Sequence, residues 1–263
     1  MIRALLAMLA GLALVGVLLF ALLLDRYGDA LRLRLDPAGE QVFANEPLPV
    51  RIPETRLVLL YGDSRIAEWD PLPEVPGYQF VNRGVAGQTT GQLLLRLEQD
   101  VLDTGADLLL LQAGINDLKA IGLWPEQRAE LTAATLDNLL RLLEEVASRG
   151  IVPVVMPVLP VGEVPLYRWP VWSAEVEPAV AALNRELAAG AQAAGWLVFD
   201  PFRQLSDADS LPLADVYRDE LHLSAGGYKK LGAALERYLA EQSLIQRPRG
   251  SGDAAASRIP VER

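Results

Sequence analysis

Short apolar runs alternate with longer amphipathic segments along most of the chain, from about Thr55 to Leu239. Five runs are strand candidates, and most of them are apolar throughout, which is typical of strands buried on both faces of a parallel sheet. The candidates are Leu57–Leu60, Gln79–Asn82, Leu108–Leu111, Ile151–Val155 and Leu197–Phe199.

Four longer segments repeat apolar residues at helical spacing. They are Thr90–Leu102, Arg128–Ala147, Val176–Ala194 and Ala225–Leu239, and Gly150 is well placed to end the second. Strands that alternate with helices in this way predict a three-layer α/β/α sandwich with a mainly parallel sheet of about five strands.

The first segment has a different pattern, because it carries no charge from Ala4 to Leu24. As a helix it would span about 30 Å, the thickness of the hydrocarbon core of a bilayer. We therefore expect one N-terminal transmembrane helix that contacts the membrane through residues 4–24. The alternative is a signal peptide that is removed on export, although the run Ala21–Asp25 is a poor cleavage signal.

The charges that flank the apolar run only weakly indicate its orientation in the membrane. Arg3 and the terminal amine favour an N-terminus on the inside, whereas Arg26 lies on the other side of the apolar run. We expect a single-pass, membrane-anchored protein whose main domain is on the outer or periplasmic side. The predicted parts are a membrane anchor or signal segment at 1–28, a connector at 29–52, a globular domain at 53–243 and a disordered tail at 244–263.

Composition excludes several classes of site. The 263 residues are 51% hydrophobic and 22% charged, as in globular proteins, and the net charge of -10 argues against nucleic acid as a partner. The chain has no cysteine, which excludes a thiolate nucleophile and a cysteine-bound metal. Its one histidine, His222, excludes a metal site made of several histidines, and any imidazole base must be this residue.

Polar segments follow three of the predicted strands, at the sheet edge where ligands bind in open parallel sheets. They are Tyr61–Arg65, Asn82–Thr90 and Gln112–Asp117. Ser64 could present its hydroxyl among backbone N–H groups, and the Asn116 amide could donate to an anionic oxygen. Each segment also has an ordinary explanation, because Ser, Thr and Asn are common in helix caps and turns.

A fourth polar segment places Asp219 three residues before His222, just ahead of a predicted helix. One turn could bring the carboxylate to the imidazole Nδ1 atom. A lone histidine is more often structural than catalytic, so this pair is only suggestive when taken alone.

Together, and in this order, the four segments resemble the signature blocks of the GDSL, or SGNH, hydrolase family. The matching positions are Gly62-Asp63-Ser64, Gly87, Gly114-Ile115-Asn116-Asp117 and the Asp219-x-x-His222 pair. The resemblance covers roughly Leu57 to Leu231, with Arg65 standing where the family motif has Leu. The chain lacks the Gly-x-Ser-x-Gly elbow of the ordinary α/β-hydrolases.

The resemblance implies an SGNH, flavodoxin-like sheet and a serine hydrolase that cleaves carboxylic esters. Ser64 would be the nucleophile, His222 the base and Asp219 the residue that orients it. The oxyanion hole would consist of the backbone N–H groups of Ser64 and Gly87 and the side-chain amide of Asn116. The resemblance implies no metal and no organic cofactor.

The substrate class stays open, since the family cleaves acyl lipids, acyl sugars and thioesters. The segment Leu159–Trp172 follows the fourth strand, and its Tyr167, Trp169 and Trp172 are candidate substrate contacts or, equally, packing residues under a long loop. An acyltransferase acting on cell-envelope glycan would use the same residues. A non-catalytic anchored binding module is a further alternative, although it would have no chemical reason to keep them.

Overall fold

The computed structural model describes residues 2–43, 46, 50–206, 213 and 215–242 of the chain. Its sheet has five strands in the order β2-β1-β3-β4-β5, and all neighbouring strands are parallel. The strands are β1 (Arg56–Gly62), β2 (Tyr78–Gly84), β3 (Leu108–Gln112), β4 (Val152–Val155) and β5 (Leu197–Val198). The predicted parallel sheet is confirmed.

The long helices agree with the predicted segments to within a few residues. They are α4 (Thr90–Asp100), α6 (Arg128–Ser148), α7 (Val176–Ala194) and α9 (Ala225–Glu241). Short helices occupy the connections, namely α3 (Ser64–Ala67), α5 (Ile115–Leu118) and α8 (Phe202–Leu205). Four 3₁₀ helices, η1 (Leu102–Thr104), η2 (Lys119–Gly122), η3 (Pro125–Gln127) and η4 (Leu166–Val171), complete the domain.

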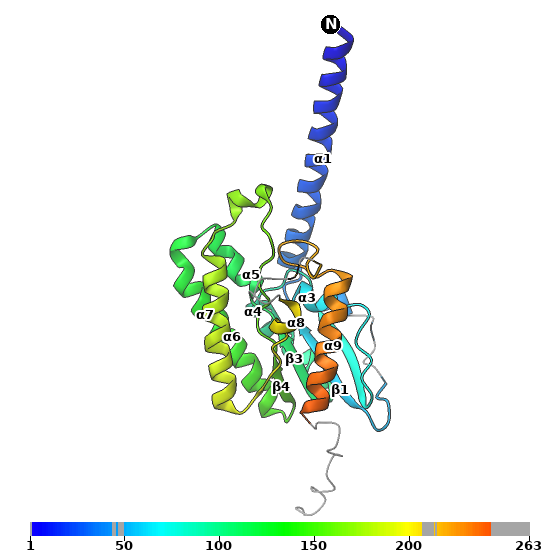
Figure 1. Cartoon of the computed structure of the whole chain (residues 1–263), viewed down its shortest axis with the longest axis vertical. Coiled ribbons are helices and arrows are strands. Elements are labelled where there is room, and N and C mark those ends of the chain that lie inside the picture. Colours follow the sequence, from blue (N-terminus) through cyan, green and yellow to red (C-terminus); the bar gives the residue numbers. More distant parts are fainter. Residues whose placement is uncertain (1, 44–45, 47–49, 207–212, 214, 243–263) are drawn as a thin grey trace, which may run out of the picture.

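Two separate apolar cores lie on the two faces of the sheet (Figure 1). Alternate side chains of a strand point to opposite faces, so Leu59 packs with α4, α6 and α7, whereas Leu60 packs with α3, α8 and α9. The expected three-layer α/β/α sandwich is therefore confirmed. Its apolar strands are buried on both sides, which explains their continuous hydrophobic runs.

The N-terminal helix α1 (Ile2–Leu35) projects away from the domain (Figure 1). Its first 20 residues, Ile2–Ala21, have a mean hydropathy of 2.7 and none of the window is buried, so this helix could cross a membrane. The helix continues past residue 28 into the predicted connector, which also contains α2 (Glu40–Phe43). The tail predicted at 244–263 lies outside the described residues.

The C-terminal end of α1 contacts the domain at the carboxyl edge of the sheet. The Gln92 side chain donates to the Leu33 carbonyl oxygen at 3.4 Å, and the Gln88 side chain donates to the Pro37 carbonyl oxygen at 3.2 Å. The helix therefore meets the domain beside the loop that follows β2, at the edge where the polar segments were expected to gather.

Candidate active site

Ser64 is the first residue of α3, immediately after β1, and it is only 8% exposed. The helix cap is the neighbouring Asp63, whose carboxylate accepts the Arg65 backbone N–H at 3.0 Å. Burial raises the pKa of Asp63 to about 6, although the nearby Arg65 guanidinium opposes this shift. Ser64 is thus free of the capping role that an ordinary turn would have given it.

Asp219 and His222 face each other as their three-residue spacing suggested. The His222 Nδ1 atom lies 2.9 Å from both carboxylate oxygens of Asp219, and its Nε2 atom lies 3.0 Å from the Ser64 Oγ atom. A continuous chain of contacts therefore runs from carboxylate to imidazole to hydroxyl, the geometry that a serine nucleophile needs.

Asp219 also organises its own loop. Burial raises its pKa, but hydrogen bonds from the backbone N–H groups of Leu221 and His222 and from the His222 ring outweigh this effect and lower the pKa to about 2. The carboxylate is consequently ionised at neutral pH, as an acceptor for the imidazole N–H must be.

A second acid, Glu68, lies near the same imidazole and was not expected from the sequence. One of its oxygens is 3.9 Å from the His222 Nε2 atom, and the other pairs with Arg218 at 3.0 Å. Since Glu68 follows α3 directly, only the folded chain brings it to His222. No local sequence motif predicts this contact.

The loop after β2 brings Gly87 to the carboxyl edge of the sheet with a φ angle of 80°, a conformation that favours glycine. An added Cβ atom there would lie 2.9 Å from the Leu33 Cδ1 atom of α1. The Asn116 amide donates to the Gln88 carbonyl oxygen at 2.9 Å, so the loops after β2 and β3 meet. Two predicted oxyanion-hole residues therefore lie on adjoining segments, Gly87 in the loop after β2 and Asn116 in α5.

Two side chains fix the Asn116 loop. Lys119 donates to the Asn116 side-chain oxygen at 2.7 Å, which holds the amide in one orientation and directs its N–H₂ group toward the loop after β2. Asp117 accepts the backbone N–H and the hydroxyl of Thr90, at 3.0 Å and 2.7 Å. Lys119 was not singled out from the sequence, because a lysine after a turn carries no distinctive signal.

Arg96, a buried residue of α4, supports the half of the site that contains Gly87 and Asn116. Its guanidinium donates to the Gln88 side-chain oxygen at 2.7 Å, to the Arg83 carbonyl oxygen at 2.8 Å and to Asp100 at 2.9 Å. It also stacks over the Tyr61 ring at 4.2 Å. These contacts connect β1, the loop after β2 and α4.

Arg65 supports the other half of the site and is almost wholly buried. Its guanidinium donates to the carbonyl oxygens of Leu221 at 2.6 Å and Leu159 at 2.8 Å, and to that of Pro160 at 3.3 Å. The residue that departs from the family motif therefore ties the segment after β4 to the loop that carries Asp219 and His222.

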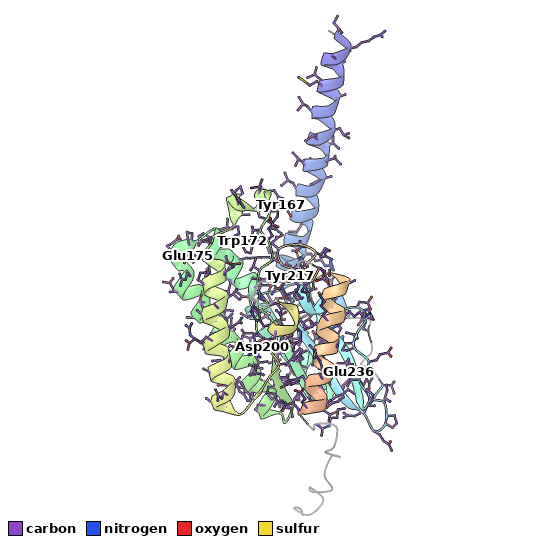
Figure 2. The ribbon with its side chains drawn as sticks, in the orientation of Figure 1. Tyr167, Trp172, Glu175, Asp200, Tyr217 and Glu236 are labelled. Atoms are coloured by element: carbon purple, nitrogen blue, oxygen red, sulfur yellow. The ribbon has the colours of Figure 1, made fainter. Side chains whose placement is uncertain are left out.

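The three aromatic residues of the segment after β4 differ in their surroundings. Tyr167 and Trp169 are exposed on η4, and Trp172 packs partly against one apolar core. Figure 2 labels Tyr167 and Trp172. No described hydrogen bond joins any of them to Ser64, Asp219 or His222. Their role as substrate contacts stays a prediction.

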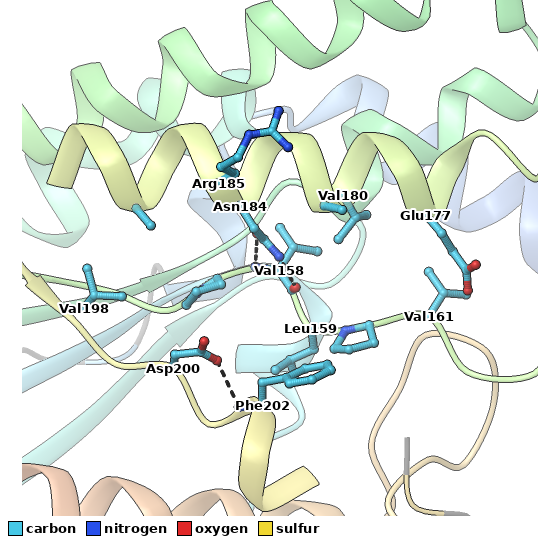
Figure 3. Close-up of a pocket in the computed structure, with 14 residues that line it drawn as sticks. Val158, Leu159, Val161, Glu177, Val180, Asn184, Arg185, Val198, Asp200 and Phe202 are labelled. Carbon is cyan, nitrogen blue, oxygen red and sulfur yellow. Dashed lines mark hydrogen bonds between the residues drawn. The ribbon is translucent and has the colours of Figure 1, made fainter. Parts of the chain in front are cut away.

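A cavity of about 400 Å³ lies between the segment after β4 and helix α7 (Figure 3). It is bounded by Val158–Val161, Val180, Asn184 and Phe202, and most of its lining is apolar. Asn184 closes one side by exchanging hydrogen bonds with the Val158 backbone at 2.8 Å and 2.9 Å. None of the predicted site residues lines this cavity, but the carbonyl oxygens of its Leu159 and Pro160 accept hydrogen bonds from Arg65, the neighbour of Ser64.

Comparisons with solved structures find proteins of the same fold. Solved structures with the same fold include a GDSL-like lipase from Bacteroides thetaiotaomicron, with 23% identity, a TM-score of 0.61 and coverage of 78% of this chain and 98% of that one. Another is a catalytic mutant of an acetylxylan esterase from Geobacillus stearothermophilus, with 20% identity, a TM-score of 0.56 and coverage of 76% and 98%. At these identities the likeness concerns the fold alone.

The sequence comparisons identify the family. An uncharacterized lipoprotein of Bacillus subtilis, YqeF, is 29% identical over 123 residues, which is 40% of this chain and 49% of the relative, so the chain spans about half the length of that protein. Residues 59–230 match the model of the GDSL-like lipase/acylhydrolase family, a range that includes every predicted residue of the triad and the oxyanion hole. The chain belongs to the GDSL-like lipase/acylhydrolase family of enzymes.

Proposed function

We propose that this protein hydrolyses carboxylic esters through an acyl-enzyme formed on Ser64. The observation that carries the proposal is the line of contacts from Asp219 through His222 to the Ser64 hydroxyl, with distances of 2.9 Å and 3.0 Å. These distances lie within the reach required of a nucleophile, its base and the group that orients the base.

In the first half of the proposed reaction, the Ser64 hydroxyl oxygen attacks the ester carbonyl carbon while His222 accepts its proton. The tetrahedral intermediate collapses, and His222 returns the proton to the departing alcohol. In the second half, water attacks the acyl-enzyme with His222 as base, and Ser64 leaves with the proton as the acid is released. The ionised Asp219 stabilises the imidazolium formed at each stage.

We assign the oxyanion hole to the backbone N–H groups of Ser64 and Gly87 and to the Asn116 amide. The orientation imposed by Lys119 supports this assignment, because it turns the Asn116 nitrogen toward the loop of Gly87 and Gln88. Donors that are already fixed stabilise the developing negative charge without reorganisation at the moment of reaction.

The test is a set of serine variants of the full chain in detergent micelles. Wild type, Ser64→Ala and His222→Ala are treated with a fluorophosphonate probe and with p-nitrophenyl esters from acetate to palmitate. Ser148→Ala is the matched control, since this hydroxyl is exposed and bonds only to the Glu145 carbonyl oxygen. We expect labelling and turnover in wild type and the control, and neither in Ser64→Ala.

Other outcomes separate the alternatives. Labelling without turnover would favour transfer of the acyl group to a glycan hydroxyl, and adding a glycan acceptor would then yield an acylated product. No labelling of well-folded wild type would overturn the hydrolase proposal and favour an anchored binding module.

We also propose that α1 remains attached and anchors the domain on the outer side of a membrane. The support is the apolar window Ile2–Ala21 with the basic Arg3 at its N-terminal end. Protease added to intact spheroplasts should then digest the domain, and alkaline washing should leave it in the membrane. Protection from protease would place the domain inside, and release by alkali would indicate that the segment had been cleaved.

A further inference from the structure

Six exposed apolar side chains gather on two adjoining segments of the domain. Four of them lie on η4, namely Leu166, Tyr167, Trp169 and Val171, with exposed fractions of 72%, 70%, 64% and 45%. The other two, Leu123 and Trp124, lie between η2 and η3. The two segments touch, because an added Cβ atom on Gly122 would lie 2.1 Å from the Val171 carbonyl oxygen. We call these six residues the apolar tip. Clusters of exposed apolar residues of this kind mark interaction surfaces.

The apolar tip and α1 project from the same end of the domain. In Figure 1 the yellow-green η4 segment rises from the end at which α1 leaves, and Figure 2 places Tyr167 on that side, far from Glu236 on α9. The carboxyl edge of the sheet, with Ser64 and Gly87, faces the same way, since the end of α1 contacts Gly87 and Gln92.

Helix geometry fixes how far the site would stand from a membrane that α1 crosses. The apolar run ends before Asp25, and Leu33, which contacts Gly87, follows eight residues later. Eight helical residues rise about 12 Å, and the headgroup layer on one side of a bilayer is about 5–8 Å thick. The site therefore opens close to the bilayer surface, and a segment that projects past it reaches the headgroups.

The side chains of the apolar tip suit that depth. Tyr and Trp carry both apolar and polar atoms, and they prefer the boundary between headgroups and acyl chains. The one charged residue within η4, Arg168, is turned toward the domain and pairs with the buried Glu220 at 2.6 Å. Its charge therefore does not oppose contact of its neighbours with lipid.

The same ion pair connects the apolar tip to the candidate catalytic loop. Glu220 lies between Asp219 and His222 in the chain, and its backbone carbonyl accepts the Gly162 N–H at 2.8 Å. The Arg168–Glu220 ion pair therefore joins η4 directly to the loop that holds the candidate acid and base.

We propose that the apolar tip rests on the bilayer that α1 crosses, so that the site receives amphiphilic acyl esters held in that bilayer. The choice of substrate rests on the proposed ester hydrolysis, whereas the contact with lipid rests only on the proposed anchoring of the domain by α1. The partner of the apolar tip is the lipid surface itself, because α1 brings that surface within reach of these six residues.

The first experiment measures depth without activity. Because the chain has no cysteine, Tyr167→Cys and Glu236→Cys each create a unique site for a nitroxide spin label. The full-length variants are reconstituted in nanodiscs of phosphatidylcholine and phosphatidylglycerol, and relaxation by oxygen is compared with relaxation by a water-soluble nickel complex. We expect the label at 167 to be shielded from nickel and accessible to oxygen, and the label at 236 to behave as in water. Equal nickel access at both positions would overturn the proposal.

The second experiment tests the substrate class. The Leu123→Ser/Leu166→Ser double variant in the same nanodiscs should lose about tenfold in kcat/KM on p-nitrophenyl palmitate in the bilayer. On soluble p-nitrophenyl acetate it should stay within about twofold of wild type. Equal loss on both esters, or loss on neither, would overturn the assignment of membrane-held substrates. If wild type hydrolyses neither ester, the proposed function fails while the spin-label result still decides the contact.

Discussion

Two buried arginines support the two halves of the candidate site, and their guanidinium groups have different kinds of partner. Arg96, below the Gly87 and Asn116 half, pairs with Asp100 four residues along the same helix. Arg65, below the Asp219 and His222 half, donates to three backbone carbonyl oxygens and forms no ion pair within 4 Å among the described residues. We conclude that Arg96 stabilises its half of the site through an ion pair. Arg65 instead joins segments that are distant in the sequence through hydrogen bonds to their carbonyl oxygens.

Breaking the Arg96 pair should have the largest effect on stability. Arg96→Met would leave the Asp100 carboxylate buried without its partner, which costs about 3–5 kcal/mol in the free energy of unfolding. Adding Asp100→Asn should restore part of that loss, because the unpaired charge is removed. Urea unfolding of the full chain measures both variants, and a double variant no more stable than Arg96→Met would contradict the compensated-pair explanation.

Asn116→Ala should have the largest effect on catalysis in the same half. Loss of one oxyanion-hole donor lowers kcat by about 10²–10³-fold, with little change in KM, since the donor acts mainly on the transition state. Steady-state kinetics on p-nitrophenyl butyrate measure this. The control is Asn138→Ala, which removes an amide bound to Thr90 rather than to Gln88. A fall in kcat of less than about fivefold would argue against the assigned role.

Arg65→Met should cost less stability than Arg96→Met but should still impair the reaction. We expect about 2 kcal/mol, since the carbonyl oxygens lose their donor and no contact ion pair is broken, although the nearby Asp63 loses a favourable charge. The loop of Asp219 and His222 should loosen, so kcat should fall by about tenfold or more. The exposed Arg185→Met is the control in urea unfolding and in kinetics. Unchanged kcat in folded Arg65→Met would show that the arginine only stabilises the fold.

The smallest effect concerns Asp63, which lies beside Arg65. Its pKa is about 6 in the folded protein against 3.8 ordinarily, so between these values the folded state binds more protons than the unfolded state and stability falls as pH rises. Asp63→Asn should therefore raise Tm relative to wild type by roughly 2–4 °C at pH 8. The difference should shrink at pH 4.5, and a difference that is equal at both pH values would refute this interpretation.

The sequence predicted the regular elements because their apolar patterns are local. The strand β3 begins with the continuous apolar run Leu108–Leu111 and is buried on both faces, and α7 keeps its helical period over nineteen residues. Four-residue helices such as α3 and α5 are too short to show a period, so they were not foreseen. The extension of α1 to Leu35 was also missed, since the polar residues after Leu24 look like a connector.

The candidate site was predictable only where its signals are local or match a known family. Asp219 and His222 are three residues apart, but Ser64 and His222 are separated by 158 positions, and only the family resemblance joined them before the fold was known. The contact of Arg65 with the Leu221 carbonyl spans 156 positions and follows no motif. The contact of Glu68 with His222 was missed for the same reason. Lys119 and Arg96 contact residues only three and eight positions away, but neither belongs to a recognisable motif.

The unbroken helix from Ile2 to Leu35 also determines where substrates are sampled. A flexible linker from Asp25 to Leu35 would let the height of the domain above the membrane vary widely, whereas the same eleven residues in a helix form a rigid stalk of about 16 Å. With α1 in a membrane, lateral diffusion would move the site within a thin layer parallel to the lipid plane. Encounter rates would then depend on the surface density of the ester instead of its bulk concentration.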